Sequence, residues 1–289
     1  MAYPRGENSH RTRLLLSDYQ PRVGRSTLDT STADLRRLRL PGAHNLRYVA
    51  GSTADGRAVR DRLLWRSNAL NAIDGDARLA LRREGIRTVV DLREDDQRRR
   101  FPNALDGVGA TIVGVPIFDG TLPRVEELGA EACRVGDLTP IYQHMVRSCG
   151  RRIAAAISHL ARPRALPAIV NCSAGKDRTG IVVAFLLDAI GVVEDDIIDD
   201  FVLTERYRKD AVATTVDRVI DLGPRSEGAE PGWLEDALRY ARETHGGAAE
   251  YLAANGLDGD SLTFLRETLL VGTPPVHERP GQLRSVAGP

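Results

Sequence analysis

Residues 165–191 read ALPAIV NCSAGKDRTG IVVAFLLDAI G and predict a strand, a tight loop and a helix in that order. The run 165–170 is short, apolar and ends in two β-branched residues, as buried strands do. The run 181–190 is long enough for a core helix, and Gly191 suits the left-handed residue that often ends one. The N-terminus of that helix would face the loop, where its free N–H groups and positive dipole end stabilise anions.

The loop has the residue types of a phosphate-binding loop built around a nucleophile. Cys172 and Arg178 are separated by five residues, and Ala174-Gly175 lets the chain curl so that successive backbone N–H groups point inward. A thiol near cations and a helix N-terminus ionises readily, so Cys172 is the candidate nucleophile that attacks phosphorus. Arg178 offers a planar fork of donors for two phosphate oxygens.

The whole run after the cysteine is predicted to bind the phosphate: Ser173, Ala174, Gly175, Lys176, Asp177, Arg178 and Thr179. Lys176 is one of only two lysines among 40 basic residues, and we expect it to add a positive charge at the rim. A carboxylate beside a phosphate is repelled unless it is protonated or turned toward the leaving group. Asp177 is therefore a candidate general acid that protonates the departing oxygen.

Asp119 is the second candidate for the general acid. It lies in the segment PIFDG, residues 116–120, directly after a predicted strand. An ordinary Asp-Gly turn explains this segment equally well. Asp177 ranks first because its neighbours in sequence place it within reach of the phosphate.

A buried structural cysteine in a glycine-containing turn is the alternative to catalysis. The spacing Cys-x5-Arg alone occurs by chance often enough to mean little. Here the spacing, the glycine, the following Thr-Gly and both flanking elements agree. The catalytic interpretation is therefore favoured.

The run CSAGKDRTG, residues 172–180, resembles the signature of the cysteine-dependent protein tyrosine phosphatase superfamily, closest to a bacterial tyrosine/lipid phosphatase family typified by a secreted mycobacterial enzyme. The stretches LWRSNAL (64–70) and EGIRTVVDLR (84–93) are similar to two further blocks of that family, so the likeness covers roughly residues 35–271. It implies hydrolysis of phosphomonoesters through a phosphocysteine, with no metal and no cofactor. The Lys-Asp pair is similar to that of members that accept phosphoinositides.

Two positions depart from the family pattern. Asn171 stands where the family has a histidine that organises the loop, and an amide supplies hydrogen bonds but no charge. Because Cys172 and Arg178 are intact, we interpret Asn171 as loop support in an active enzyme; the alternative is a non-catalytic phosphate-binding protein. Residues 45–51, NLRYVAG, match the family block N-x-R-D-L-G-G weakly.

The rest of the chain predicts an α/β fold, with a central, mostly parallel sheet flanked by helices and extra helices at the C-terminal end. We expect a flexible arm over 1–27, one domain over 28–271 and a disordered tail with four prolines over 272–289. Asp91 is interpreted as structural, and the run Arg98–Arg100 as a solvated face near the site mouth. The remaining predicted elements are helices 74–84, 194–207 and 232–271 and strands 87–92 and 111–116.

The charge balance and the cysteines limit the function classes. Forty basic residues offset 40 acidic ones, so nothing draws the whole molecule to nucleic acid or to a membrane surface. Residues 1–10 lack the features of a secretory signal and no apolar run approaches bilayer length, which predicts a cytoplasmic protein. Cys133, Cys149 and Cys172 form no metal or disulfide pattern. The expected substrate is a phosphorylated protein, a phosphoinositide or a small-molecule phosphate ester.

Overall fold

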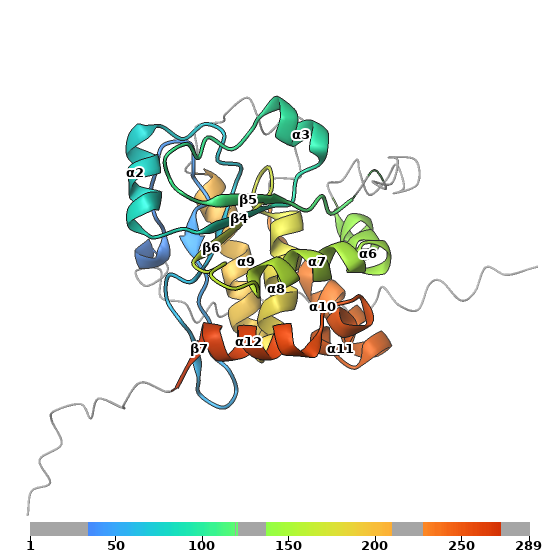
Figure 1. The fold of residues 1–289 in the computed structure, drawn as a ribbon. Helices are drawn as coiled ribbons and strands as arrows, with labels where there is room; N and C mark the ends of the chain where they lie inside the picture. Colours follow the sequence, from blue (N-terminus) through green and yellow to red (C-terminus); the bar gives the residue numbers. More distant parts are fainter. Residues whose placement is uncertain (1–33, 119, 121–136, 210–227, 273–289) are drawn as a thin grey trace, which may run out of the picture.

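The computed structural model describes residues 34–118, 120, 137–209 and 228–272. The predicted arm over 1–27 lies outside these residues, as does the predicted tail except Gly272. Figure 1 shows the elements, which are, in chain order, β1 (Arg47–Tyr48), β2 (Ala58–Val59), β3 (Leu64–Ser67), α2 (Gly75–Arg83), β4 (Thr88–Asp91), α3 (Asp95–Arg100), β5 (Thr111–Gly114), α6 (Thr139–Ser148), α7 (Gly150–Leu160), β6 (Ala168–Asn171), α8 (Asp177–Ile190), α9 (Glu194–Lys209), α10 (Pro231–His245), α11 (Ala248–Ala254), α12 (Gly259–Leu269) and β7 (Leu270–Val271).

The main sheet has five strands in the order β1-β3-β6-β4-β5. Only β1 is antiparallel to its neighbour; the other pairs are parallel. The register places the last residues of four strands side by side: Ser67, Asn171, Asp91 and Gly114. The predicted α/β fold with a mostly parallel sheet is confirmed, and its carboxyl edge is where ligands of such sheets bind.

Helices cover both faces of this sheet (Figure 1). Side chains alternate between the faces, so Val89 and Ile169 pack toward α2 while Val90 and Val170 pack toward α6–α12. The helical layer on the second face includes the predicted C-terminal helices. Within the part of the chain that the structure describes, no helix is long and apolar enough to cross a membrane.

Helix α8 runs through the centre of the molecule. Every residue from Arg178 to Ile190 except Asp188 is buried. The helix begins at Asp177, four residues before the apolar run, so the end of the predicted loop forms its first turn. Gly191 ends it in the left-handed conformation, with φ 98°, as predicted.

The sequence-based boundaries are correct for α2 and wrong at the C-terminal end. Asp74 caps α2 by accepting a 2.8 Å hydrogen bond from the N–H of Ala77. The segment predicted to be helical over 232–271 is three helices, and its last two residues, Leu270 and Val271, form β7. These two residues are extended because they pair with Ala58 and Val59 of β2, a partner too distant in sequence for a local pattern to indicate.

Candidate active site

The loop 172–176 joins β6 to α8 at the carboxyl edge of the sheet. Gly175 makes its tight turn with φ +68°, and a Cβ atom there would overlap the backbone carbonyl of Ser67 on the neighbouring strand. Only glycine satisfies both the left-handed backbone and this close approach. The loop is therefore pressed directly onto the end of β3.

Three consecutive carbonyl groups of the loop accept hydrogen bonds from residues outside the loop. The N–H of Ala69 donates to the carbonyl of Ser173 at 3.0 Å. The Asn45 amide donates to the carbonyls of Ala174 and Gly175 at 3.1 and 3.0 Å, and Arg66 Nη2 donates to that of Gly175 at 2.9 Å. In a planar trans peptide the next N–H points opposite to the carbonyl. The N–H groups of residues 174–176 consequently face inward, as an anion-binding loop requires.

A buried charge cluster stands behind the loop. Asp200 of α9 pairs with Arg66 at 2.6 Å and with Arg47 at 3.1 Å, and Arg36 lies 3.8 Å away. Burial raises the pKa of Asp200, but the three arginines outweigh it and hold that pKa well below its usual range. Burial lowers the pKa of Arg47 to about 10 despite Asp200. The weakly matching segment 45–51 thus supports the loop through Asn45 and Arg47.

Arg178 projects from the first turn of α8 and is buried. Its Nη2 donates to the hydroxyl of Ser173 at 3.1 Å, and its Nη1 donates to Gln97 Oε1 at 3.1 Å and to the carbonyl of Leu92 at 3.5 Å. Glu94 Oε1 lies 3.7 Å from Nη1. The guanidinium is therefore fixed over the loop by α3 and the chain that leads into it.

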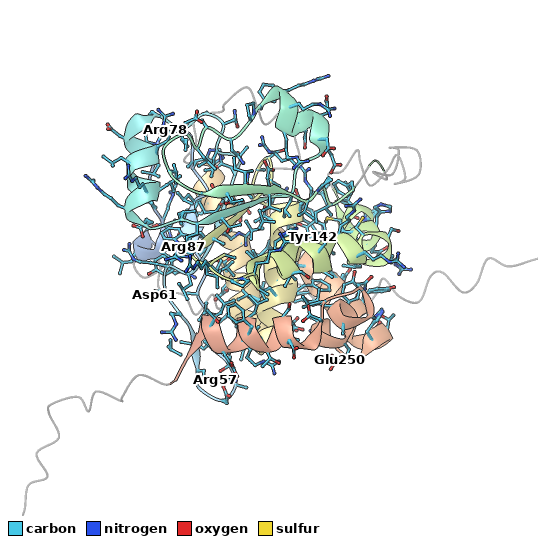
Figure 2. The ribbon with its side chains drawn as sticks, in the orientation of Figure 1. Arg57, Asp61, Arg78, Arg87, Tyr142 and Glu250 are labelled. Carbon is cyan, nitrogen blue, oxygen red and sulfur yellow. The ribbon has the colours of Figure 1, made fainter. Side chains whose placement is uncertain are left out.

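Lys176 and Asp177 contact residues of α6, of α10 and of the chain that precedes α10. Lys176 is 1% exposed, so the expectation that it lies at the rim is wrong. Its Nζ donates to the carbonyl of Gly228 at 3.0 Å and lies 5.3 Å from the ring centre of Trp233 in α10. Tyr142 of α6, labelled in Figure 2, donates a 2.9 Å hydrogen bond to Asp177 Oδ1. Lys176 Nζ is 3.6 Å from the same oxygen.

Three predicted site residues lie deep in the structure. Cys172 is 3% exposed and opens the loop directly after β6. Asn171 and Thr179 are fully buried, and the amide atoms of Asn171 and the hydroxyl of Thr179 have no hydrogen-bond partner among the described residues. The predicted residues 171–179 thus lie together at the carboxyl edge of the sheet, and among them the Arg178 guanidinium contacts the Ser173 hydroxyl.

Asp119 lies outside the described residues. Its neighbour Phe118 is described, and the Arg178 guanidinium carbon is 5.8 Å from the centre of the Phe118 ring. Asp91 accepts hydrogen bonds from both the backbone and the side chain of Arg93, in agreement with the structural role expected for it. Arg98, Arg99 and Arg100 pair with Asp95 or Asp96 within α3, as residues of a solvated face do.

The sequence patterns did not indicate four residues that contact Lys176, Asp177 or Arg178: Glu94, Gln97, Tyr142 and Trp233. Glu94 and Gln97 follow the predicted strand 87–92, and that strand end was the one available signal for them. Tyr142 and Trp233 carry no local motif. Among the described residues, no group of three His, Cys, Asp or Glu side chains is placed to hold a metal ion.

The chain is similar in sequence to known phosphatases. Residues 38–271 match the model of the tyrosine phosphatase family. The chain is 29% identical to the triple specificity protein phosphatase PtpB of Mycobacterium tuberculosis, over 80% of this chain and 98% of that protein. It is 28% identical to a putative tyrosine-protein phosphatase of Cupriavidus necator, over 64% and 67% of the two chains. A crystal structure of P. aeruginosa TpbA in complex with pTyr aligns with 15% identity and a TM-score of 0.33, covering 76% of this chain and 94% of that one. The chain belongs to the tyrosine phosphatase family, whose chemistry is the hydrolysis of phosphate esters.

Proposed function

We propose that Cys172 is the nucleophile of a metal-independent phosphomonoesterase. The observation that carries this proposal is the loop in which three carbonyls are bonded outward and the next three N–H groups face inward, with Cys172 at its start. The thiolate forms a bond to phosphorus while the P–O bond to the leaving group breaks. Water then attacks the phosphocysteine, and inorganic phosphate leaves as the thiolate is restored.

Arg178 and the inward N–H groups form the clamp for the equatorial phosphate oxygens. Arg178 Nη2 already contacts Ser173 in the loop, so the guanidinium is positioned before substrate arrives. Preorganised donors of this kind stabilise developing charge without reorganising during the reaction. Lys176 contributes a buried positive charge, and its ammonium group contacts Gly228 and Trp233.

The general acid is Asp177 or Asp119. Asp177 has a fixed carboxyl group, because Tyr142 and Lys176 both contact its Oδ1 atom. The evidence in favour of Asp119 is the position of its neighbour Phe118, whose ring lies beside the Arg178 guanidinium. Either residue would hand its proton to the leaving oxygen and then, as the conjugate base, take a proton from the attacking water.

The substrate class that we propose is a phosphorylated protein. The support is the name of the mycobacterial relative, a triple specificity protein phosphatase that matches this chain over 98% of its length. Phosphoinositides and small-molecule phosphate esters remain alternatives within the same chemistry. The names of the relatives do not favour a metabolite phosphatase or a non-catalytic module.

The test is turnover of an aryl phosphate by the native protein, by Cys172→Ser and by Cys149→Ser. Cys149 is equally buried but lies at the junction of α6 and α7, so Cys149→Ser is the matched control. We expect Cys172→Ser to lose turnover while it still binds tungstate, and Cys149→Ser to retain turnover. Turnover by Cys172→Ser, or activity of the native protein that EDTA abolishes and a divalent ion restores, would contradict the mechanism. Ranking a phosphotyrosine peptide, a phosphoinositide and a sugar phosphate by kcat/KM then decides the substrate class.

A further inference from the structure

Arg178 has a carboxylate beside it that the phosphatase mechanism above does not use. Of the described residues, Glu94 is the only acid that forms an ion pair with this guanidinium, at 3.7 Å. The remaining described partners of Arg178 are neutral: the amide of Gln97, the carbonyl of Leu92, the hydroxyl of Ser173 and the ring of Phe118. Glu94 is thus the counter-ion of a buried cation that must also bind a phosphate.

Backbone contacts hold Glu94 in this place. It precedes α3, and its N–H donates to Gln97 Oε1 at 3.3 Å, the oxygen that also accepts from Arg178. Its carboxylate accepts a 3.3 Å hydrogen bond from the N–H of Phe118. The side chain is 27% exposed, so protons from solvent reach it.

The charges around Glu94 make its ionisation sensitive to an anion on Arg178. Burial raises the pKa of Glu94, whereas Arg178 and the N–H groups of Phe118 and Gly120 lower it; Asp95, the next residue in the chain, adds to the increase. A phosphate dianion bound to Arg178 brings two further negative charges close to this carboxylate. Like charges that share a site cannot all remain ionised without cost; the loop N–H groups and Arg178 favour the dianion in its charged form, so the proton goes to the Glu94 carboxylate.

We propose that Glu94 is a resident anion that competes with phosphate for Arg178, and that a dianion bound in the loop displaces it with uptake of one proton by the Glu94 carboxylate. The proton comes from solvent, and no bond between heavier atoms changes. The proposal rests on the phosphate-binding role of Arg178. Its consequence is that rising pH weakens the binding of dianions, including the product inorganic phosphate, and returns Glu94 to Arg178.

The probe is sulfate, which stays dianionic across the range in which a carboxylate titrates. The protein is the full chain carrying Cys172→Ser and Asp177→Asn, so that neither the thiol nor the second carboxylate next to the loop takes up a proton. Calorimetry in two buffers with different protonation enthalpies gives the protons taken up for each sulfate bound. At mildly acidic pH we expect fractional proton uptake, which Glu94→Gln abolishes. At mildly alkaline pH Glu94→Gln should bind sulfate about fivefold more tightly, an advantage that shrinks as the pH falls.

Asp95→Asn is the matched control. It removes the same charge from the next residue, which is 61% exposed and pairs with Arg98 instead of Arg178. Proton uptake and sulfate affinity should both stay close to those of the parent. Glutamine at position 94 keeps an acceptor for the N–H of Phe118, so the loop into α3 is retained.

Arg178→Lys separates this proposal from the proposed function. If Arg178→Lys weakens sulfate binding while Glu94→Gln leaves affinity and proton uptake unchanged, the competition by Glu94 is wrong and the phosphate clamp stands. If sulfate affinity is unchanged in Arg178→Lys as well, Arg178 is not part of the anion site, and both the clamp and the competition are wrong.

Discussion

The hydroxyl of Tyr142 donates a 2.9 Å hydrogen bond to the carboxyl group of Asp177, across 35 residues of sequence. Tyr142 is fully buried and lies 5.7 Å from Trp233 and 6.2 Å from Phe201, ring centre to ring centre. Burial and the adjacent Asp177 raise the pKa of Tyr142 well above its usual value, so the phenol remains a donor. A helix outside the loop thus fixes the orientation of the leading candidate for the general acid.

Removing this hydroxyl should slow the step in which the leaving group departs. We expect Tyr142→Phe to lower kcat about tenfold on alkyl phosphates and to change it little on nitrophenyl phosphate, which leaves without protonation; a factor of ten corresponds to about 1.4 kcal/mol, within the range of about 0.5–1.5 kcal/mol that one hydrogen bond contributes. The measurement is kcat against leaving-group pKa. Tyr251→Phe is the control, because that buried hydroxyl donates to the carbonyl of Val146 outside the site. An equal loss on every substrate would mean that Tyr142 supports the loop and does not orient an acid.

Gly175→Ala should inactivate the protein for a steric reason. The new methyl group would overlap the Ser67 carbonyl and would also strain a left-handed backbone. We expect a loss of kcat/KM of about 100-fold or more, on the scale found when groups in an active site are displaced by about 1 Å. Gly85→Ala is the control: its φ is +69° but nothing lies within 4 Å of the added carbon. It should cost about 1–2 kcal/mol of stability and leave turnover unchanged. Full activity in Gly175→Ala would show that the loop does not need this close approach.

Asp200→Asn should destabilise the fold through the arginines it leaves unpaired. Removing one partner of a buried ion pair costs about 3–5 kcal/mol in free energy of unfolding. Asp236→Asn breaks an exposed pair with Arg239 and should cost about 1 kcal/mol or less. Because the pKa of Asp200 is depressed in the folded state, its contribution is present above the ordinary aspartate pKa and is lost as pH falls below it. Urea unfolding of both variants at neutral and acidic pH measures this, and equal losses for the two would refute it.

Asn171→His should change the pH dependence of turnover. Asn171 is fully buried between Ser67 and Asp91 on the neighbouring strands, with its amide atoms unbonded to described residues. An imidazolium there would add a positive charge next to Cys172 and favour its thiolate. We expect the acidic limb of kcat/KM to move down by about one pH unit, which corresponds to roughly 1.4 kcal/mol. Asn171→Ala, which adds no charge, should leave the limb in place. Coincident profiles for the native protein and Asn171→His would show that the loop geometry alone controls the nucleophile.

Local patterns were sufficient for the elements next to the loop. The apolar runs around 171–180 predicted β6 and α8, and the capping residue Asp74 predicted α2, because each signal lies within the element itself. Helix α3 reads DDQRRR and has no apolar face, so periodicity could not indicate it. It forms where Gln97 reaches Arg178, 81 residues further along the chain.

The same distinction applies to the site. Cys172 and Arg178 are only six positions apart in the chain, so a local sequence pattern was sufficient to pair them. The loop between them is held by Asn45 and by Arg66, which pairs with Asp200, and only the tertiary fold brings these residues to the loop. Lys176 was predicted at the rim because the sequence does not show that Trp233 and Gly228 cover it.

The small sheet β2-β7 affects how this chain folds during synthesis. Ala58 pairs with Val271, and the N–H of Arg60 donates to the carbonyl of Leu269. Contacts between residues so far apart in sequence carry a large loop-closure cost and form late. A ribosome-bound chain that has emerged only as far as α11 therefore holds β2 without its partner strand. We expect this phosphatase to complete its domain only after residue 271 has left the ribosomal exit tunnel.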